Sequence, residues 1–426
     1  MSVNVHQNDA EHVIQALRLG TVPQRGLQLY SVGNEREYAV LQDELQTVVS
    51  GHSRLKAIRG GYGSGKTFIT SRLAEDALAA RFVVSRVSLN RDGYSLHRLE
   101  SFYQGVMQQM RVKGTEGNAL ASILDRWMDA AEEYVIDVQG VPEQPVHALQ
   151  AAVRARMEVL LKDTVQERPS FAAALAGYYE AHLHMDHERK RQALGWLMAD
   201  PHASTRPLRG VRGYIEGTDV FAYLQEFVRI IRQMGRPGLV IIVDELDEMR
   251  HLVRRDMRAR AWASLRDLID RLGSNVEGVY VVLAATPDVL RGPRSIEELP
   301  PLAQRLSEPT ADSAHPNLRG AQLPLQPFTE AQLGDVLRRI RILWERAVGE
   351  PSRLPQGFED HLARGWTERL GARSPRIAIR EFIAVLDRLH DYATYDPLTE
   401  YDFDLPAEVF TPEERGDVWL APEDMF

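Results

Sequence analysis

The sequence contains no cysteine among its 426 residues. This absence excludes disulfide bonds, thiolate nucleophiles and metal sites with thiolate ligands. Long apolar runs are also missing, because no stretch approaches the roughly 18 residues that a membrane-spanning helix needs. The segment 1–20 lacks a basic start followed by a continuous apolar stretch, which is the pattern of a secretory signal. We therefore predict a cytoplasmic location and no membrane partner.

An excess of positive charge is missing as well. The chain has 51 Lys and Arg against 60 Asp and Glu, which gives a formal net charge of −9. This balance argues against a chain coated with positive charge for non-specific binding of nucleic acid. A local basic surface remains open, because arginines crowd a helix predicted within 250–271, although such a cluster is also typical of a solvated helix face. The cluster comprises Arg254, Arg255, Arg258, Arg260 and Arg266.

The remaining pattern predicts an α/β fold. Helical segments separate a short strand at 55–59, a β-branched strand at 82–89 and apolar strands at 239–243 and 279–284. Such strands indicate a parallel sheet that helices cover on both faces. We predict a helical flank (1–30), a first part of a P-loop core (31–95), a helical insertion (96–209), a second part of the core (210–317), a helical lid (318–395) and an acidic tail (396–426). The tail is expected to pack on the rest of the chain only if something covers Trp419 and Phe426.

A glycine-rich turn at 60–67 carries the strongest chemical signal. The residues Gly60, Gly61, Tyr62, Gly63, Ser64, Gly65, Lys66 and Thr67 match G-x-x-x-x-G-K-[ST]. A strand precedes the turn and a helix follows it, as the Walker A phosphate loop requires. Glycines bring backbone N–H groups against phosphate oxygens, Lys66 is placed to reach the β- and γ-phosphates, and Thr67 is placed to bind Mg²⁺. The predicted cofactors are ATP and Mg²⁺.

The strand at 239–243 ends in two carboxylates, which is the Walker B pattern. We predict that Asp244 holds Mg²⁺ through water and that Glu245 orients or deprotonates the attacking water. A glutamate at this position favours hydrolysis over passive nucleotide binding. Thr286 follows the next apolar strand, where a sensor-1 residue contacts the γ-phosphate or the attacking water. The alternative is a threonine that merely ends a strand before Pro287.

Two arginines are candidates for stabilising the negative charge of a phosphoryl-transfer transition state. Arg305 follows the strand at 279–284 and is a candidate finger for a neighbouring subunit, while Arg376 begins a helix of the lid and is a candidate sensor-2 residue. Arg373 competes with Arg376 for that role. Ordinary surface arginines are the alternative explanation for both positions.

The segment 182–187 matches H-x-H-x-D-H, the first metal motif of metallo-β-lactamase-like hydrolases. The flanking pattern is helical on both sides, and we predict that the motif lies inside a helix. A helix would spread these ligands around its circumference and leave only His184 and His187 on one face. We therefore favour a polar helix face, and keep a zinc-dependent hydrolase as an alternative function.

The order of these motifs resembles AAA+ ATPases of the Orc/Cdc6 and STAND-like groups. Over nearly the whole chain, the sequence is more similar to the BREX-system ATP-binding family. The residues that carry this similarity are 16–20 with Pro23, the Walker A segment 61–67, Trp196-Leu197, and Gly238-Leu239 at the start of Walker B.

The resemblance implies a component of a bacterial anti-phage defence system. Its partners would be a DNA methyltransferase, a large P-loop protein, an alkaline-phosphatase-like protein and often a helicase. The expected function is an AAA+-like ATPase that assembles as a homo-oligomer or on a partner and remodels or loads a complex on double-stranded DNA. A nucleotide-dependent switch or scaffold with little turnover is the alternative from another functional class.

Overall fold

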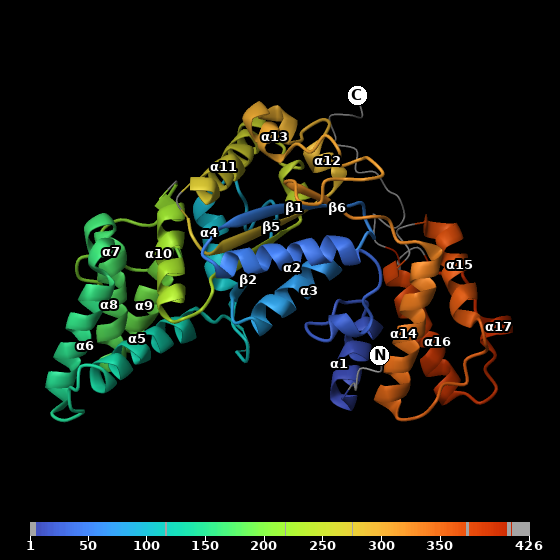
Figure 1. Ribbon diagram of the computed structural model, residues 1–426, viewed down its shortest axis with the longest axis horizontal. Helices are drawn as coiled ribbons and strands as arrows, with labels where there is room; N and C mark the ends of the chain where they lie inside the picture. The colour runs from blue at the N-terminus through green and yellow to red at the C-terminus, as the bar shows by residue number, and fades with distance from the viewer. Residues whose placement is uncertain are drawn as a thin grey trace.

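The computed structural model describes residues 6–115, 117–217, 219–274, 276–371, 375–406 and 410. Figure 1 shows an arch in which a central β-sheet carries a helical arm on one side and a helical bundle on the other. Within the described ranges, no helix has the length and apolar character that crossing a membrane would require. Residues Trp419 and Phe426 of the predicted tail lie outside these ranges.

The central sheet has six strands in the order β3-β2-β4-β5-β1-β6. The strands are β1 (Arg54–Arg59), β2 (Val83–Ser88), β3 (Met110–Arg111), β4 (Leu239–Asp244), β5 (Val279–Ala285) and β6 (Gln322–Pro324). All neighbouring strands run parallel except β3, which is antiparallel to β2. The mixed α/β fold with a mostly parallel sheet is therefore confirmed, and the four predicted strands lie within one residue of their expected bounds.

Sequence analysis missed the two edge strands. The two residues of β3 lie inside the predicted helical insertion, and the three residues of β6 lie inside the range predicted as the lid. Both strands are too short to show a period-2 pattern, so only their pairing with β2 and β1 reveals them. The sheet core therefore extends into both ranges that were predicted to be helical.

Each face of the sheet packs on a different set of helices. On one face lie α2 (Glu35–Val49) and α3 (Lys66–Ala79), packed on β-strand residues such as Ile58 and Val240. On the other face lie α4 (Leu99–Gln108), α10 (Asp219–Gln233), α11 (Arg255–Ser274) and α13 (Pro300–Leu306). That face receives the alternate residues, such as Ala57 and Ile241. Burial on both faces explains why β5 is a continuous apolar run and why β4 is apolar up to its last residue.

One charged residue is buried inside this sheet. The side chain of Lys56 on β1 is 1% exposed, and its Nζ lies 2.7 Å from Glu44 Oε1 on α2. The same Nζ donates to the carbonyl of Gly320, just before β6, at 2.6 Å. Tyr280 on β5 donates to Glu44 Oε2 at 2.7 Å. The ammonium is thus satisfied by a carboxylate and a carbonyl, as burial of a charge requires.

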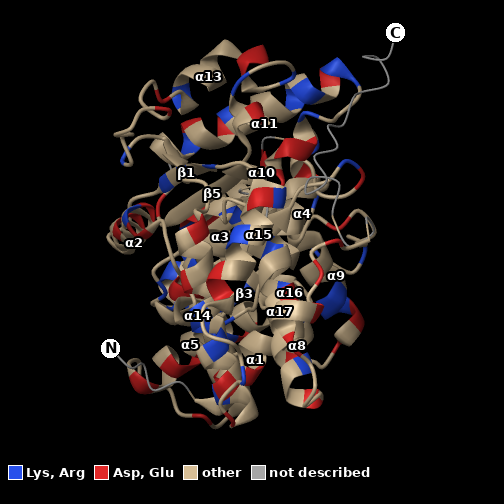
Figure 2. Cartoon of the chain, turned by 90° about the vertical axis from the view of Figure 1, so that its right-hand side faces the viewer, with Lys and Arg blue, Asp and Glu red and all other residues tan. Residues whose placement is uncertain are grey.

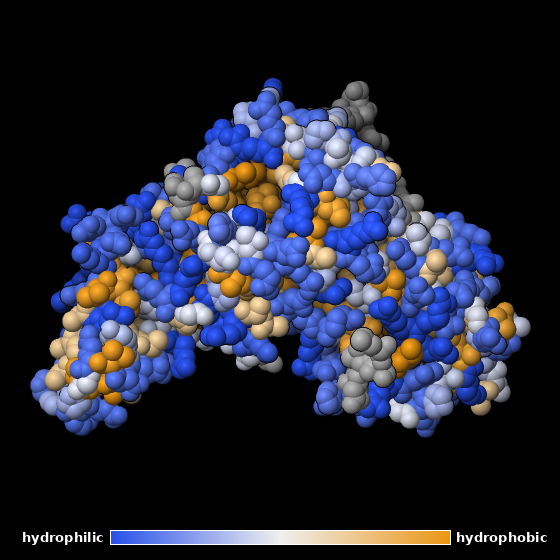
Figure 3. All heavy atoms as spheres, in the orientation of Figure 1, coloured by the Kyte–Doolittle hydropathy of each residue, from blue (hydrophilic) through white to orange (hydrophobic). Residues whose placement is uncertain are grey.

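The arm consists of helices from the predicted insertion. They are α5 (Leu120–Asp137), α6 (Val146–Leu160), α7 (Lys162–Glu167), α8 (Pro169–Leu183) and α9 (His187–Leu197). Their buried side chains belong to the same apolar cluster as one face of the sheet. Hydrophobic residues also reach the surface of the arm in Figure 3. Val138 and Val159 are both exposed. The first helix of the predicted insertion, α4, instead packs on β2, where Ser85 Oγ donates to Val106 O at 2.8 Å.

The bundle on the other side contains α14 (Glu330–Val348), α15 (Phe358–Leu370), α16 (Pro375–Asp391) and α17 (Pro397–Glu400). Thr329 and Gln332 form a capping box that starts α14. The N-terminal helix α1 (Gln7–Arg18) shares the apolar cluster of this bundle, and Arg18 Nε lies 2.8 Å from Asp387 Oδ2 on α16. A helix predicted as a separate flank therefore packs with the lid helices. The remaining short helices are η1 (Leu27–Leu29), η2 (Leu246–Met249), α12 (Pro287–Leu290) and η3 (Ile296–Glu298).

Candidate nucleotide-binding site

The glycine-rich turn joins the carboxyl end of β1 to the amino end of α3. Gly63 and Gly65 take φ angles of 76° and 89°, in the left-handed region that favours glycine. Ser64 Oγ donates to Gly61 O at 2.8 Å and closes the turn from inside. A methyl group added at Gly61 or Gly65 would meet no atom within 4 Å, so the space beside these glycines is open. The loop therefore has the form of a cradle for an anion at a helix N-terminus.

Lys66 is the first residue of α3, and its ammonium lies in the mouth of this loop. Its Nζ donates to Gly60 O at 2.8 Å and to Gly61 O at 3.1 Å. Burial lowers the pKa of Lys66, while the carboxylates of Asp247 and Asp244 oppose that shift. The ammonium is held by the loop's own carbonyls, and phosphate oxygens can take their place as stronger, charged acceptors.

The predicted carboxylates lie at the same edge of the sheet. Asp244 ends β4, and its Oδ2 lies 3.1 Å from Arg86 Nε on the adjacent strand β2. Glu245 follows with a φ of 58°, which is uncommon for a residue with a side chain. Its Oε2 accepts a hydrogen bond from Ser88 Oγ at 2.5 Å, and the side chain is exposed. Thr67 is also exposed, one residue after Lys66 on α3.

Thr286 directly follows β5, which lies between β1 and β4 in the sheet. Its side chain is buried, and both its hydroxyl and its backbone N–H donate to the carboxylate of Asp247. Sequence analysis did not single out Asp247. The available signal was a second aspartate three residues after Asp244, in the segment Asp-Glu-Leu-Asp-Glu. Asp247 links the end of β5 to the segment that follows Walker B.

Sequence analysis also missed Arg86. The structure places it on β2 beside Asp244, where it also donates to the hydroxyls of Thr70 and Ser71 on α3, the latter at 2.8 Å. Burial lowers the pKa of Arg86, and Asp244 opposes that shift. The only signal in the sequence was a charged residue inside a strand whose other residues are valine and serine.

The two arginines that are candidates for stabilising the transition state lie on α13 and α16. Arg305 Nη2 on α13 donates to Asp270 Oδ2 on α11 at 2.9 Å, and its other partner is the Pro301 carbonyl. Arg376 is the second residue of α16 and is exposed. Arg373 lies outside the described residues. Their catalytic roles therefore stay predictions.

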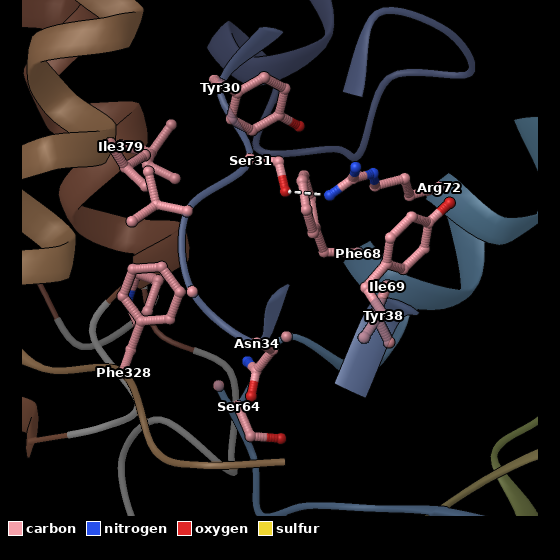
Figure 4. Close-up of a pocket in the computed structure, with 16 residues that line it drawn as sticks. Tyr30, Ser31, Asn34, Tyr38, Ser64, Phe68, Ile69, Arg72, Phe328 and Ile379 are labelled. Carbon is pink, nitrogen blue, oxygen red and sulfur yellow. Dashed lines mark hydrogen bonds between the residues drawn. The ribbon is translucent and has the colours of Figure 1, made fainter. Parts of the chain in front are cut away.

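An apolar pocket adjoins the phosphate loop, between α3 and the lid helices. Phe68 and Ile69 of α3 lie on one side, and Phe328 and Ile379 lie on the other (Figure 4). The segment 30–34 runs between them and contributes Tyr30, Ser31, Val32, Gly33 and Asn34. An apolar, partly aromatic lining suits the faces of a planar heterocycle. The pocket combines residues from distant parts of the chain, so no sequence motif indicates it.

The histidine motif does not lie inside one helix, contrary to our prediction. Helix α8 ends at Leu183 and α9 begins at His187, with Met185 in a left-handed turn between them. His182 Nδ1 lies 3.0 Å from Lys190 Nζ, so an ammonium occupies the side where a metal would be. Among the described residues, no group of three His, Asp or Glu side chains is placed to hold a metal ion. A zinc-dependent hydrolase gains no support from this geometry.

Comparison of the sequence with models of known protein families matches residues 5–404 to the family described as BREX system ATP-binding protein BrxC/D. The match spans the phosphate loop, the arm and the lid helices. A search of curated proteins finds no match.

Proposed function

The chain belongs to the BREX system ATP-binding protein family BrxC/D, and from this premise we propose that it is a Mg²⁺-dependent ATPase of a BREX defence system. The observation that carries the proposal is the meeting of three segments at one edge of the sheet. The phosphate loop follows β1, Asp244 ends β4 with Glu245 directly after it, and Thr286 directly follows β5, the strand between them. A phosphate cradle, a metal-binding carboxylate and a base thus face one space.

The residues at this edge fit Mg²⁺ and a triphosphate. The Thr67 hydroxyl and the Asp244 carboxylate are hard oxygen ligands of the kind that Mg²⁺ prefers, and the open space beside Gly61 and Gly65 leaves room for phosphate oxygens. When bound, Mg²⁺ neutralises charge on the β- and γ-phosphates. Lys66 supplies a second, compact positive charge from the other side of the loop.

Glu245 is the candidate general base. It lies one residue after the metal-binding aspartate and is exposed, so a water molecule can reach it. Its hydrogen bond from Ser88 holds the carboxylate in place and also occupies one oxygen. That bond is the observation that favours the second candidate function, a nucleotide-dependent switch with little turnover until Glu245 is released.

The apolar pocket is the candidate site for the adenine base. It adjoins Gly63, Ser64 and Gly65, so a base in it and phosphates on the loop are compatible with one nucleotide. Phe328 lies just before α14 and Ile379 lies on α16, so nucleotide binding would couple the lid to the core. The position of β5 between β1 and β4 supports an AAA+-like ATPase. In such an enzyme, Arg305 would stabilise the transition state in the site of a neighbouring copy of a homo-oligomer, and Arg376 would contact the phosphates from the lid.

In the cell, such an ATPase would act on the other BREX proteins. We propose that nucleotide-driven movement of the lid or arm remodels or loads a DNA-associated complex that contains them. This part of the proposal rests on family membership and on the two-sided pocket.

Phosphate release from ATP tests the proposal directly. Purified protein should release phosphate with Mg²⁺ and not with excess EDTA, and Lys66→Ala should weaken nucleotide binding by about 10- to 100-fold, because a charge-assisted contact contributes roughly 1.5–3 kcal/mol. Lys113→Ala, at an exposed lysine outside the site, is the matched control. Unchanged nucleotide affinity in a folded Lys66→Ala variant would reject the site.

A further inference from the structure

Arg86 is a cation placed inside the candidate site by the fold. It lies on β2, next to β4, and its side chain is only 34% exposed. A guanidinium that is mostly removed from water needs several partners, because burial of an unpaired charge is costly. The partners of Arg86 come from two elements that both belong to the candidate site.

The first partner is the carboxylate of Asp244, 3.1 Å from Arg86 Nε. This contact is an ion pair rather than a hydrogen bond, because the Nε–H does not point at an acceptor. The remaining partners lie on the first turns of α3, the helix that starts at the phosphate loop. They are the hydroxyls of Thr70 and Ser71 and the carbonyl of Thr67, at 3.4 Å. Arg86 thus joins the Walker B strand to the phosphate-loop helix.

This position has an electrostatic consequence. Asp244 carries a negative charge beside the space for an anionic triphosphate. Negative charges that lie close together repel each other, and a partly buried site screens this repulsion poorly. Mg²⁺ removes that repulsion when it is present. The Arg86 guanidinium stays charged at any physiological pH and pairs with the same carboxylate without a metal.

We propose that Arg86 is a resident counter-cation for Asp244, which lets the site bind a nucleotide before or without Mg²⁺. The inference rests on the proposed ATP site and adds a positioning residue to it. Arg86 acts through Asp244 and α3 rather than by touching the reacting atoms. Its charge should therefore set how strongly nucleotide affinity depends on Mg²⁺.

The test measures the affinity for a fluorescent ATP analogue in EDTA and in saturating Mg²⁺, by anisotropy. Arg86→Gln should weaken binding in EDTA by about tenfold through loss of the neutralising charge, and much less in Mg²⁺. Arg86→Lys keeps the charge but not the two-pronged set of guanidinium donors, and its affinity for the analogue should stay near that of the parent. Arg91→Gln is the matched control, since Arg91 also pairs with a carboxylate through its Nε, which lies 3.1 Å from Glu248 Oε2.

A double variant covers the risk that Arg86→Gln does not fold. Arg86→Gln with Asp244→Asn removes both charges, so it should fold and recover the parent's affinity in EDTA. Three outcomes would overturn the inference while leaving the ATP site intact. They are a loss of affinity in EDTA that is equal in Arg86→Gln and Arg86→Lys, an equal loss in Arg91→Gln, and a double variant that does not recover the affinity of the parent. A parent that binds no nucleotide with or without Mg²⁺ would overturn the proposed function and this inference together.

Discussion

At the scale of single residues, Glu245 directly after β4 has an uncommon backbone conformation. Glu245 holds a left-handed backbone conformation that costs a residue with a side chain roughly 1–3 kcal/mol. The surrounding contacts maintain it, since Asp244 pairs with Arg86 on one side and Leu246 is buried on the other. The turn directs the Glu245 carboxylate toward Ser88 at the end of β2. Strain of this kind is often retained at functional sites, which agrees with a catalytic role for Glu245.

Replacement of Glu245 by glutamine tests that role. The amide keeps the shape and the hydrogen bond from Ser88 but cannot accept a proton, so ATP turnover should fall by about 10²- to 10⁴-fold while nucleotide affinity stays within a few-fold. Phosphate release and analogue binding measure the two quantities separately. Glu248→Gln, which changes a nearby carboxylate paired with Arg91, should turn over ATP at a rate close to that of the parent. Normal turnover in Glu245→Gln would assign the base to another residue.

At the scale of elements, the arginines of α11 are closer to the solvated helix face than to the basic surface, the two alternatives that the sequence left open. Arg258 is buried, donates to Leu252 O at 2.8 Å and pairs with Glu298, so it cannot contact DNA without loss of core contacts. The exposed Arg254 and Arg260 both pair with Asp256. Figure 2 shows acidic and basic residues interspersed along this helix. The periodic spacing of arginines indicated a helix but not which of them reach solvent.

A different set of arginines lies in the segment between α9 and α10. Arg206, Arg209 and Arg212 are exposed, and no acidic side chain among the described residues forms an ion pair with them. Trp196 Nε1 donates to Gly213 O at 2.9 Å, which anchors the segment to the arm. These three arginines are therefore better placed than those of α11 to meet a phosphate backbone.

DNA binding by the two surfaces can be compared with matched charge reversals. The variant Arg206→Glu, Arg209→Glu, Arg212→Glu should lose affinity for duplex DNA and reduce the slope of log affinity against log salt by about 3, since each phosphate contact contributes about 0.9. The triple variant of α11 with Arg254→Glu, Arg255→Glu and Arg260→Glu should change the DNA affinity and the salt slope less. Anisotropy of labelled DNA over a salt series measures the slope. If the α11 variant has the larger effect, α11 contacts the DNA rather than the segment between α9 and α10.

At the scale of the whole molecule, the segment 26–34 ties the core to the lid. Gly26 N donates to Glu75 Oε1 on α3 at 2.7 Å, and Arg72 of α3 donates to Ser31 Oγ at 2.8 Å. Helix α1, at the other end of this segment, packs with the lid helices. Helix α1 and the lid helices share one apolar cluster, against which Phe68 of α3 packs. A nucleotide in the apolar pocket would touch both the core and the lid.

Removal of one lid side chain from the pocket tests this coupling. Phe328→Ala should weaken binding of ATP by about tenfold, because contact between an aromatic ring and a base contributes roughly 1–3 kcal/mol. Ile342→Ala on α14, where the side chain is 59% exposed, is the control and should leave affinity unchanged. Binding of inorganic triphosphate, which has no base, should be the same in both variants. Equal weakening of triphosphate and ATP by Phe328→Ala would place the base elsewhere.

The chain's local chemistry was determined by its sequence. Contiguous residues form the phosphate loop and the Walker B strand, so their identities and spacing suffice to predict them. The same holds for β4 and β5, whose burial on both faces leaves continuous apolar runs. Tertiary structure alone decided which distant residues meet. Arg86 and Asp244, Thr286 and Asp247, and the two sides of the apolar pocket come from separate segments. No local pattern records such partners, because pairing depends on strand order and helix packing rather than on neighbours in the chain.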